Sequence, residues 1–245
     1  DIYGTFFIIL MYYNMYDYFT KKSYLTGFRK SLKPLLICGI FFGLGAASKW
    51  IGIYAGGGLA LLFFLAKYLE YRDYKKLKKK AFLPDWCSRF FSHYILRTCL
   101  YCVLFFVVIP GIIYALSYIP YMAVPGPGHG FSVLFRNQAA MLKYHSRDVL
   151  SATHTFSSFW WEWPLILKPL LTYRGSGLPA GISSSIAVMG SPAIWWPGIV
   201  AIAAAIVIAI QKRDKKMIVV FTAIAFQYLP WVGITRITFI YHFFS

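Results

Sequence analysis

Apolar residues fill most of the chain in six long stretches, and polar residues gather in the gaps between them. A helix that spans a bilayer needs about 20 mostly apolar residues. The stretches predict six membrane-spanning helices, at residues 2–19, 34–47, 51–66, 90–118, 194–210 and 217–234. A short turn at residues 48–50 joins the second helix to the third. Glycines in these two helices favour close helix contact: Gly43, Gly45, Gly56, Gly57 and Gly58.

The composition agrees with lipid as the solvent of this chain. It is 59% hydrophobic and 13% charged, whereas a soluble domain carries about 25% charged residues. A net charge of +17 would suit nucleic acid, but the basic residues lie between the apolar stretches. We therefore expect a lipid bilayer and no nucleic acid as partner. The expected fold is all-α, a polytopic transmembrane helical bundle in an integral, multi-pass membrane protein.

The basic residues also predict an orientation. If six helices alternate, 18 of the 25 lysines and arginines fall on one face, in the segments 21–33, 67–97 and 212–216. Cytoplasmic loops carry such an excess, so this basic face is expected to be cytoplasmic. The other face, outside the cytoplasm, holds the remaining seven: Lys49, Arg136, Lys143, Arg147, Lys168, Arg174 and Arg236.

This arrangement divides the chain into three parts. Residues 1–118 hold four helices, residues 119–193 form a large outer loop, and residues 194–245 hold two helices and the start of a further outer segment. Within the loop, apolar residues recur at helical spacing over 131–142, which predicts a helix lying in the membrane interface. The chain opens on Asp1 rather than Met, so we expect a fragment of a longer protein.

The outer face gathers the residues that could carry chemistry. Four of five histidines and three of eight acids fall there: His129, His145, His154, His242, Asp1, Asp148 and Glu162. Nucleotide-binding motifs are absent, and the nine-residue spacing of His145 and His154 matches no standard zinc pattern. Cys99 and Cys102 are interpreted as buried thiols. We expect no metal and no cofactor, and the charge at helix ends favours interfacial chemistry over transport.

Several segments resemble the protein O-mannosyltransferase family. The longest cover residues 144–150 (YHSRDVL) and 154–165 (HTFSSFWWEWPL). Shorter ones are DIYGTFF at residues 1–7, SKWIG at 48–52, GSP with a following WW at 190–196, and YLPW…R…FIYHF at 228–243. Thr155 and Phe156 replace the family's Pro-Tyr pair, and Lys168 replaces an Arg. The loop is too short for the extra soluble domain of eukaryotic members, so the resemblance is to a prokaryotic-type enzyme.

The resemblance implies a GT-C-like membrane glycosyltransferase. It would transfer mannose from a polyprenyl-phosphate-mannose donor to Ser/Thr hydroxyls of an acceptor protein, on the extracytoplasmic side of the cell membrane. The family's catalytic acidic pair would lie upstream of residue 1, which leaves the catalytic residues unknown and Asp1 a weak candidate. A homo- or heterodimer is compatible with the family. Substrate-binding residues are expected at Lys49, His145, His154, Trp160, Trp163, Arg236 and His242.

Three alternatives remain open at this stage. Another lipid-linked sugar transferase could move a sugar such as aminoarabinose onto a lipid. A membrane transporter or channel would share the apolar helices. A non-catalytic partner subunit would share the motifs but lack the acidic pair.

Overall fold

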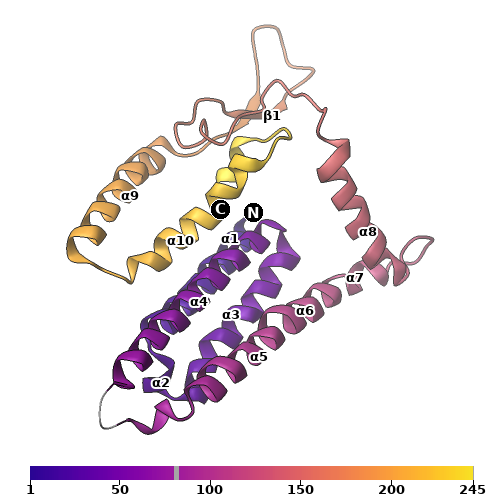
Figure 1. Ribbon diagram of the computed structural model, residues 1–245. Coiled ribbons are helices and arrows are strands. Elements are labelled where there is room, and N and C mark those ends of the chain that lie inside the picture. Colours follow the sequence, from indigo (N-terminus) through magenta and orange to yellow (C-terminus); the bar gives the residue numbers. More distant parts are fainter. Residues whose placement is uncertain (80–82, 245) are drawn as a thin grey trace. The chain divides into compact units, whose positions relative to one another are not determined.

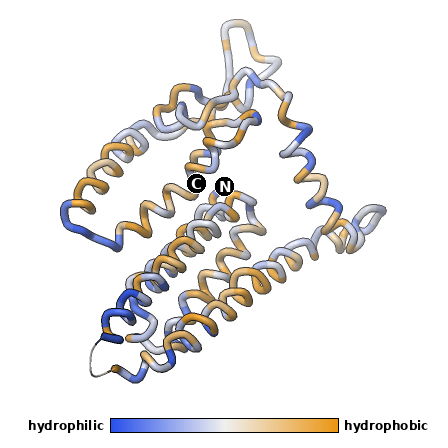
Figure 2. The backbone as a smooth tube through the Cα atoms, in the orientation of Figure 1, coloured by the Kyte–Doolittle hydropathy of each residue, from blue (hydrophilic) through white to orange (hydrophobic). Residues whose placement is uncertain are grey.

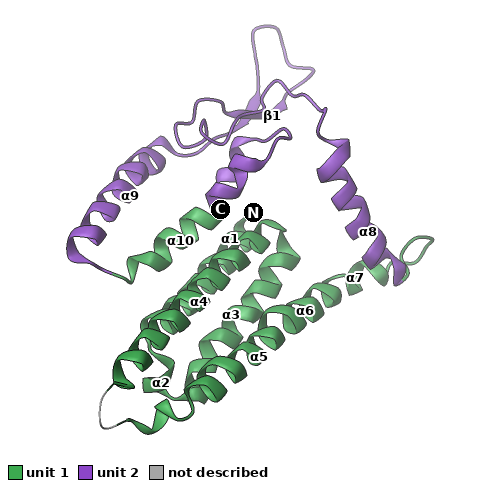
Figure 3. Ribbon diagram, in the orientation of Figure 1, with its two compact units in different colours: residues 1–130, 215–227 green, residues 131–214, 228–245 purple. Residues whose placement is uncertain are grey.

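The computed structural model describes residues 1–79 and 83–244, which form two compact units (Figures 1 and 3). Unit 1 comprises residues 1–130 and 215–227, and unit 2 comprises residues 131–214 and 228–245. Lys80, one of the basic residues counted above, lies outside the described residues. Each unit has its own set of packed elements and is described by itself.

Unit 1 is a helical bundle. It contains α1 (Ile2–Thr20), the single turn α2 (Ser23–Thr26), α3 (Phe28–Ser48) and α4 (Ile51–Leu77). Helix α1 packs against α3 and α4, and α3 packs against the later helix α6 (Ile109–Ser117). The predicted turn between the second and third helices is confirmed, since only Lys49 and Trp50 separate α3 from α4.

Two glycines permit the close helix contact that the sequence predicted. A Cβ atom at Gly43 of α3 would lie 2.9 Å from the Cα atom of Pro110, and one at Gly58 of α4 would lie 2.1 Å from the Tyr12 hydroxyl. Both distances are shorter than side chains allow. The missing side chain at Gly43 lets the backbone at Pro110 approach, and at Gly58 it leaves room for the Tyr12 side chain.

A long helical segment, Phe90–Met122, completes this bundle. It runs through a π-helical stretch η2 (Phe90–Arg97), α5 (Thr98–Val103), a second π-helical stretch η3 (Leu104–Val108), α6 (Ile109–Ser117) and α7 (Ile119–Met122). A short 3₁₀ turn η1 (Asp85–Cys87) precedes it. Pro110 is the second residue of α6, separated from the end of η3 by Ile109. Since proline has no N–H and crowds the preceding turn, a widened turn accommodates it.

Unit 2 contains most of the predicted outer loop, from residue 131 onward. Helix α8 (Ser132–Lys143) confirms the helix predicted at 131–142, and it continues into a π-helical turn η4 (Tyr144–Asp148). Strands β1 (Leu170–Arg174) and β2 (Ser185–Val188) form an antiparallel hairpin with an irregular register between Leu171 and Tyr173. The hairpin was not predicted. Its strands are short and mostly exposed, so they lack the apolar alternation that identifies a half-buried strand.

The C-terminal elements are α9 (Pro192–Lys212), α10 (Met217–Tyr228) and the 3₁₀ turns η5 (Leu229–Gly233) and η6 (Ile240–Phe244). Helix α10 ends just before Pro230, and the 3₁₀ turn takes over there. Helix α9 has no buried residue. Apolar side chains on all of its faces are suited to contact with lipid.

Four helices among the described residues are long and apolar enough to cross a membrane. They are Phe28–Ser48, Ile51–Leu77, Phe90–Met122 and Pro192–Lys212. Helix α1 forms as predicted, but its five tyrosines, Asn14 and Asp17 lower its hydropathy, and α10 has only 12 residues. The polytopic helical fold is thus confirmed, while the six-span arrangement stays a prediction.

Helix α4 is longer than predicted. The sequence predicted its end near Ala66, where lysines begin, but the helix continues to Leu77. Residues 67–77 contain no glycine or proline and are mostly good helix formers, so charge ends the apolar stretch without ending the helix. Figure 2 shows the hydrophilic residues concentrated at this end of α4.

Candidate functional site

Two of the segments that resemble the family meet in unit 2. The backbone N–H of Ser158 donates to the carbonyl of Thr238 at 2.8 Å, and the Thr238 hydroxyl donates to the carbonyl of Ser158 at 2.7 Å. Both residues are buried. This pair of bonds fixes the tryptophan-rich stretch of the outer loop onto the segment that follows α10.

A buried aromatic cluster lies beside this connection. The Trp163 side chain is fully buried, and its indole N–H donates to the Ser158 hydroxyl at 3.0 Å. Its ring centroid lies 5.5 Å from that of Trp231 and 5.9 Å from that of His242. His242 is 7% exposed and stacks on Tyr241 at 4.2 Å. Trp163 and His242 therefore form the interior of the site and support the residues around them.

The exposed face of the site carries His145 and Arg236. His145 lies in η4, next to the exposed ring of Tyr144, while the half-buried Arg236 donates to the carbonyl of Ile237 at 3.3 Å. Local desolvation, and then the charge of Arg236, lower the pKa of His145. Burial raises the pKa of Tyr241, and the Arg236 charge opposes that shift. A cation, an imidazole and phenol rings thus share one surface.

His154 and Trp160 lie at the edge of the same unit. The exposed His154 accepts a hydrogen bond from the N–H of Phe156 at 3.1 Å, and its ring meets that of Phe239 edge-on at 5.1 Å. The Trp160 carbonyl accepts from the Tyr228 hydroxyl at 2.9 Å, and the two rings lie 5.8 Å apart. Unit 2 therefore holds six of the seven predicted binding residues, and His154 offers a ring face to solvent.

The seventh residue, Lys49, belongs to unit 1. It follows α3, where its N–H donates to the carbonyl of Gly45 at 2.9 Å, and its side chain forms an ion pair with Asp1. Burial lowers the pKa of Lys49. Next to it, the indole N–H of Trp50 donates to the Tyr114 hydroxyl at 2.9 Å. Asp1, the weak catalytic candidate, is thus paired with Lys49.

Sequence reasoning missed several residues that shape the site in unit 2. Ser158 and Thr238 connect its two segments, Trp231 fills its interior, and Tyr144 and Tyr241 line its surface. Four of the five stand inside the segments that carry the family resemblance, and Thr238 stands between two of them. The motifs marked most of these residues, but the contacts of Ser158 with Thr238 and of Trp231 with Trp163 join residues too far apart in the chain to be inferred from spacing.

The fold and this site define a multi-pass helical membrane protein whose polar side chains gather at helix ends and in one large loop. Residues 131–245 match the family described as the C-terminal four TMM region of protein-O-mannosyltransferase. This match confirms the resemblance carried by the motifs: residues 131–245 are similar to the C-terminal membrane region of protein O-mannosyltransferases.

Two curated relatives carry the name polyprenol-phosphate-mannose–protein mannosyltransferase, from the CDC 1551 / Oshkosh and H37Rv strains of Mycobacterium tuberculosis. Each is 26% identical to this chain over 226 residues, which is 79% of this chain and 40% of the relative. The chain thus spans about 40% of the length of these relatives. No solved structure matches it.

Proposed function

We propose that this chain is the membrane part of a glycosyltransferase that moves mannose from polyprenyl-phosphate mannose to Ser or Thr hydroxyls of a protein. The names of the two relatives support the donor and the acceptor class. The excess of basic residues on the opposite face supports an active face outside the cytoplasm.

One observation carries the proposal: the hydrogen bonds between Ser158 and Thr238 hold the segment that contains the half-buried Arg236 on the tryptophan-rich stretch of unit 2. A phosphate that leaves with the polyprenyl chain needs a fixed cation. Arginine is suited to this role because its planar guanidinium can donate two parallel hydrogen bonds to phosphate oxygens. A poorly hydrated surface strengthens such an interaction.

The exposed aromatic rings suit the sugar and the acceptor chain. In the transfer, the acceptor hydroxyl oxygen bonds to the anomeric carbon of mannose as the bond from that carbon to the phosphate oxygen breaks. Polyprenyl phosphate leaves with the bonding electrons. The hydroxyl proton passes to a general base, for which the family resemblance implies a carboxylate of the first outer loop.

The test is transfer by the purified full-length enzyme, with a Ser/Thr peptide as acceptor. Mannose should pass from polyprenyl-phosphate mannose to the peptide. Polyprenyl-phosphate aminoarabinose with a lipid acceptor should give no product. Product only in the second assay would identify a different lipid-linked sugar transferase. Absence of product in both would favour a transporter or a non-catalytic partner subunit.

A further inference from the structure

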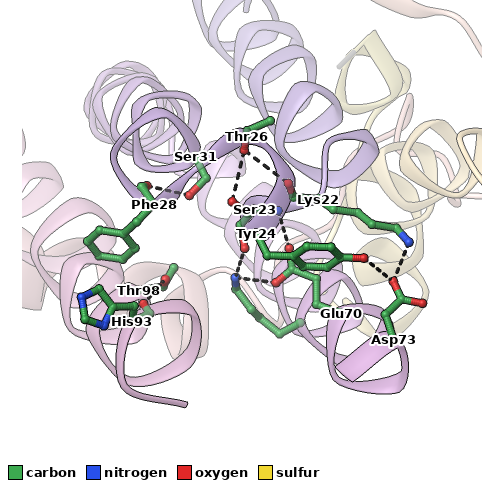
Figure 4. Close-up of polar contacts among 11 residues, drawn as sticks. Lys22, Ser23, Tyr24, Thr26, Phe28, Ser31, Glu70, Asp73, His93 and Thr98 are labelled. Atoms are coloured by element: carbon green, nitrogen blue, oxygen red, sulfur yellow. Dashed lines mark hydrogen bonds and ion pairs between the residues drawn. The ribbon is translucent and has the colours of Figure 1, made fainter. Parts of the chain in front are cut away.

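Unit 1 contains a cavity of about 250 Å³ at the basic ends of its helices. It is formed by the end of α1, the C-terminal half of α4 and the residues that precede α10. Six basic side chains line it against two acidic ones: Lys21, Lys22, Arg72, Lys76, Lys215 and Lys216, with Glu70 and Asp73. The polar contacts around part of it appear in Figure 4.

The two carboxylates are already engaged by other groups of unit 1. Glu70 accepts from the N–H of Ser23 at 2.6 Å and pairs with the buried Lys67 at 2.9 Å. Asp73 accepts from Lys22 at 2.5 Å and from the Tyr24 hydroxyl at 2.8 Å, so that Lys22 and Tyr24 converge on it (Figure 4). The carboxylates therefore hold the α1–α2 connection against α4, and two of them against six cations leave the cavity with an excess of positive charge.

Three of the cations that line the cavity lie outside these ion pairs. In the described part of the chain, no carboxylate pairs with Arg72, Lys76 or Lys215, and all three side chains are exposed. They come from two segments that lie more than a hundred residues apart in the sequence but line one cavity. Like charges held together in this way repel each other, and a bound anion would relieve the repulsion.

The wall of the cavity identifies the kind of anion. Phe19, Ala66 and Leu69 line it together with the cations, and both α1 and α4 run from this end into the apolar bundle. A soluble anion would gain nothing from these apolar side chains. A membrane lipid would place its phosphate among the cations and its glycerol and first methylenes against the apolar wall. Basic pockets between membrane helices bind lipid head groups in this way.

We propose that this cavity binds the phosphate head group of an anionic membrane lipid, on the basic face that the sequence predicts to be cytoplasmic. The site is independent of the proposed mannosyl transfer. It would fix the positions of α1, α4 and the segment before α10 relative to one another, at a point where their charges alone would drive them apart.

The test uses the purified full-length protein in a neutral detergent and fluorescent short-chain phosphatidic acid as the probe. The wild-type protein should bind phosphatidic acid and show little binding of phosphatidylcholine. The variant Arg72→Gln/Lys76→Gln/Lys215→Gln should bind it at least about tenfold more weakly. A matched variant, Lys78→Gln/Lys79→Gln/Lys212→Gln, removes three exposed charges that do not line the cavity and should keep nearly wild-type affinity.

Two results would overturn the proposal. Equal weakening in both triple variants would mean that phosphatidic acid responds only to the overall basic charge of this face. Displacement of the probe by an equal concentration of inorganic phosphate would mean that the cavity takes free phosphate and that the apolar wall adds nothing. Because all the substituted side chains are exposed, neither variant should unfold at a lower temperature than the wild type.

Discussion

Ser158 and Thr238 are separated by 80 positions in the chain and exchange two hydrogen bonds, one through the backbone N–H of Ser158 and one through the Thr238 hydroxyl. The Ser158 hydroxyl at the same point accepts from the buried indole of Trp163. One residue thus fixes both the outer loop and the ring on which Trp231 and His242 pack.

The first prediction concerns the stability of this connection. Ser158→Ala leaves the indole N–H of Trp163 buried without its acceptor, which should cost about 1–3 kcal/mol. Thermal unfolding or limited proteolysis of the full-length protein in detergent would measure it. Thr238→Ser keeps the hydroxyl and serves as the control, with near wild-type stability. A Ser158→Ala variant as stable as the wild type would show that the Trp163 cluster does not depend on this bond.

The second prediction concerns His145. Local desolvation and the Arg236 charge both lower its pKa below 6.5, so the neutral imidazole is favoured in the folded protein. Above the unfolded pKa of about 6.5, the His145 imidazole is neutral in both the folded and the unfolded protein, and it costs the folded state nothing. As the pH falls through the folded pKa, the folded protein has to accept the proton in an unfavourable place and loses stability. Arg236→Gln should raise the pKa of His145 by removing the repulsion, as measured by NMR on labelled histidine.

Arg174→Gln is the matched control for that titration, because Arg174 is an exposed arginine on the β1 strand of the same unit. It should leave the pKa of His145 unchanged. An equal shift in both variants would indicate a general effect of net charge instead of a specific neighbour.

The third prediction separates two roles of Lys49. Its side chain pairs with Asp1, and both are about one-third exposed, so the pair itself should contribute only about 0.2–1 kcal/mol. If Lys49 holds the donor phosphate, Lys49→Met should raise the KM for polyprenyl-phosphate mannose, while Asp1→Asn leaves it near wild type. Equal changes in the two variants would mean that Lys49 serves only the ion pair.

The fourth prediction tests topology. Ser176 lies in the outer loop and Lys78 directly after α4, and both are exposed. Single cysteines at these positions should react with a membrane-impermeant reagent from opposite sides of sealed vesicles. Because the six-span arrangement puts 18 of the 25 basic residues on the Lys78 side, it predicts that Ser176→Cys reacts from the extracytoplasmic side. Reaction of both from one side would refute the six-span arrangement.

The sequence was most informative where apolar length decides the structure. The helices α3, α4 and α9 and the turn at Lys49 follow from hydropathy, and α8 follows from helical periodicity. The extension of α4 to Leu77 was missed because lysines end an apolar stretch without lowering helix propensity. The hairpin of β1 and β2 was missed because its strands are short, exposed and irregular in register.

Only part of the candidate site could be predicted from the sequence. The motifs marked the correct segments, but burial depends on contacts between residues far apart in the chain. Trp163 and Trp160 stand three positions apart in one motif, yet the first is fully buried and the second is half-exposed. Nothing in their spacing distinguishes a ring that supports the site from a ring that reaches its surface.

Arg236 gives the most direct test of the account. If its guanidinium holds the leaving phosphate with two hydrogen bonds, lysine cannot replace it. Initial rates of mannosyl transfer from polyprenyl-phosphate mannose to a Ser/Thr peptide should be measured for purified full-length enzyme, normalised to folded protein. Arg236→Lys should lower kcat/KM by about tenfold or more, close to 1.4 kcal/mol, and Arg174→Lys should not. Wild-type kcat/KM for Arg236→Lys across donor concentrations would contradict the proposed phosphate site.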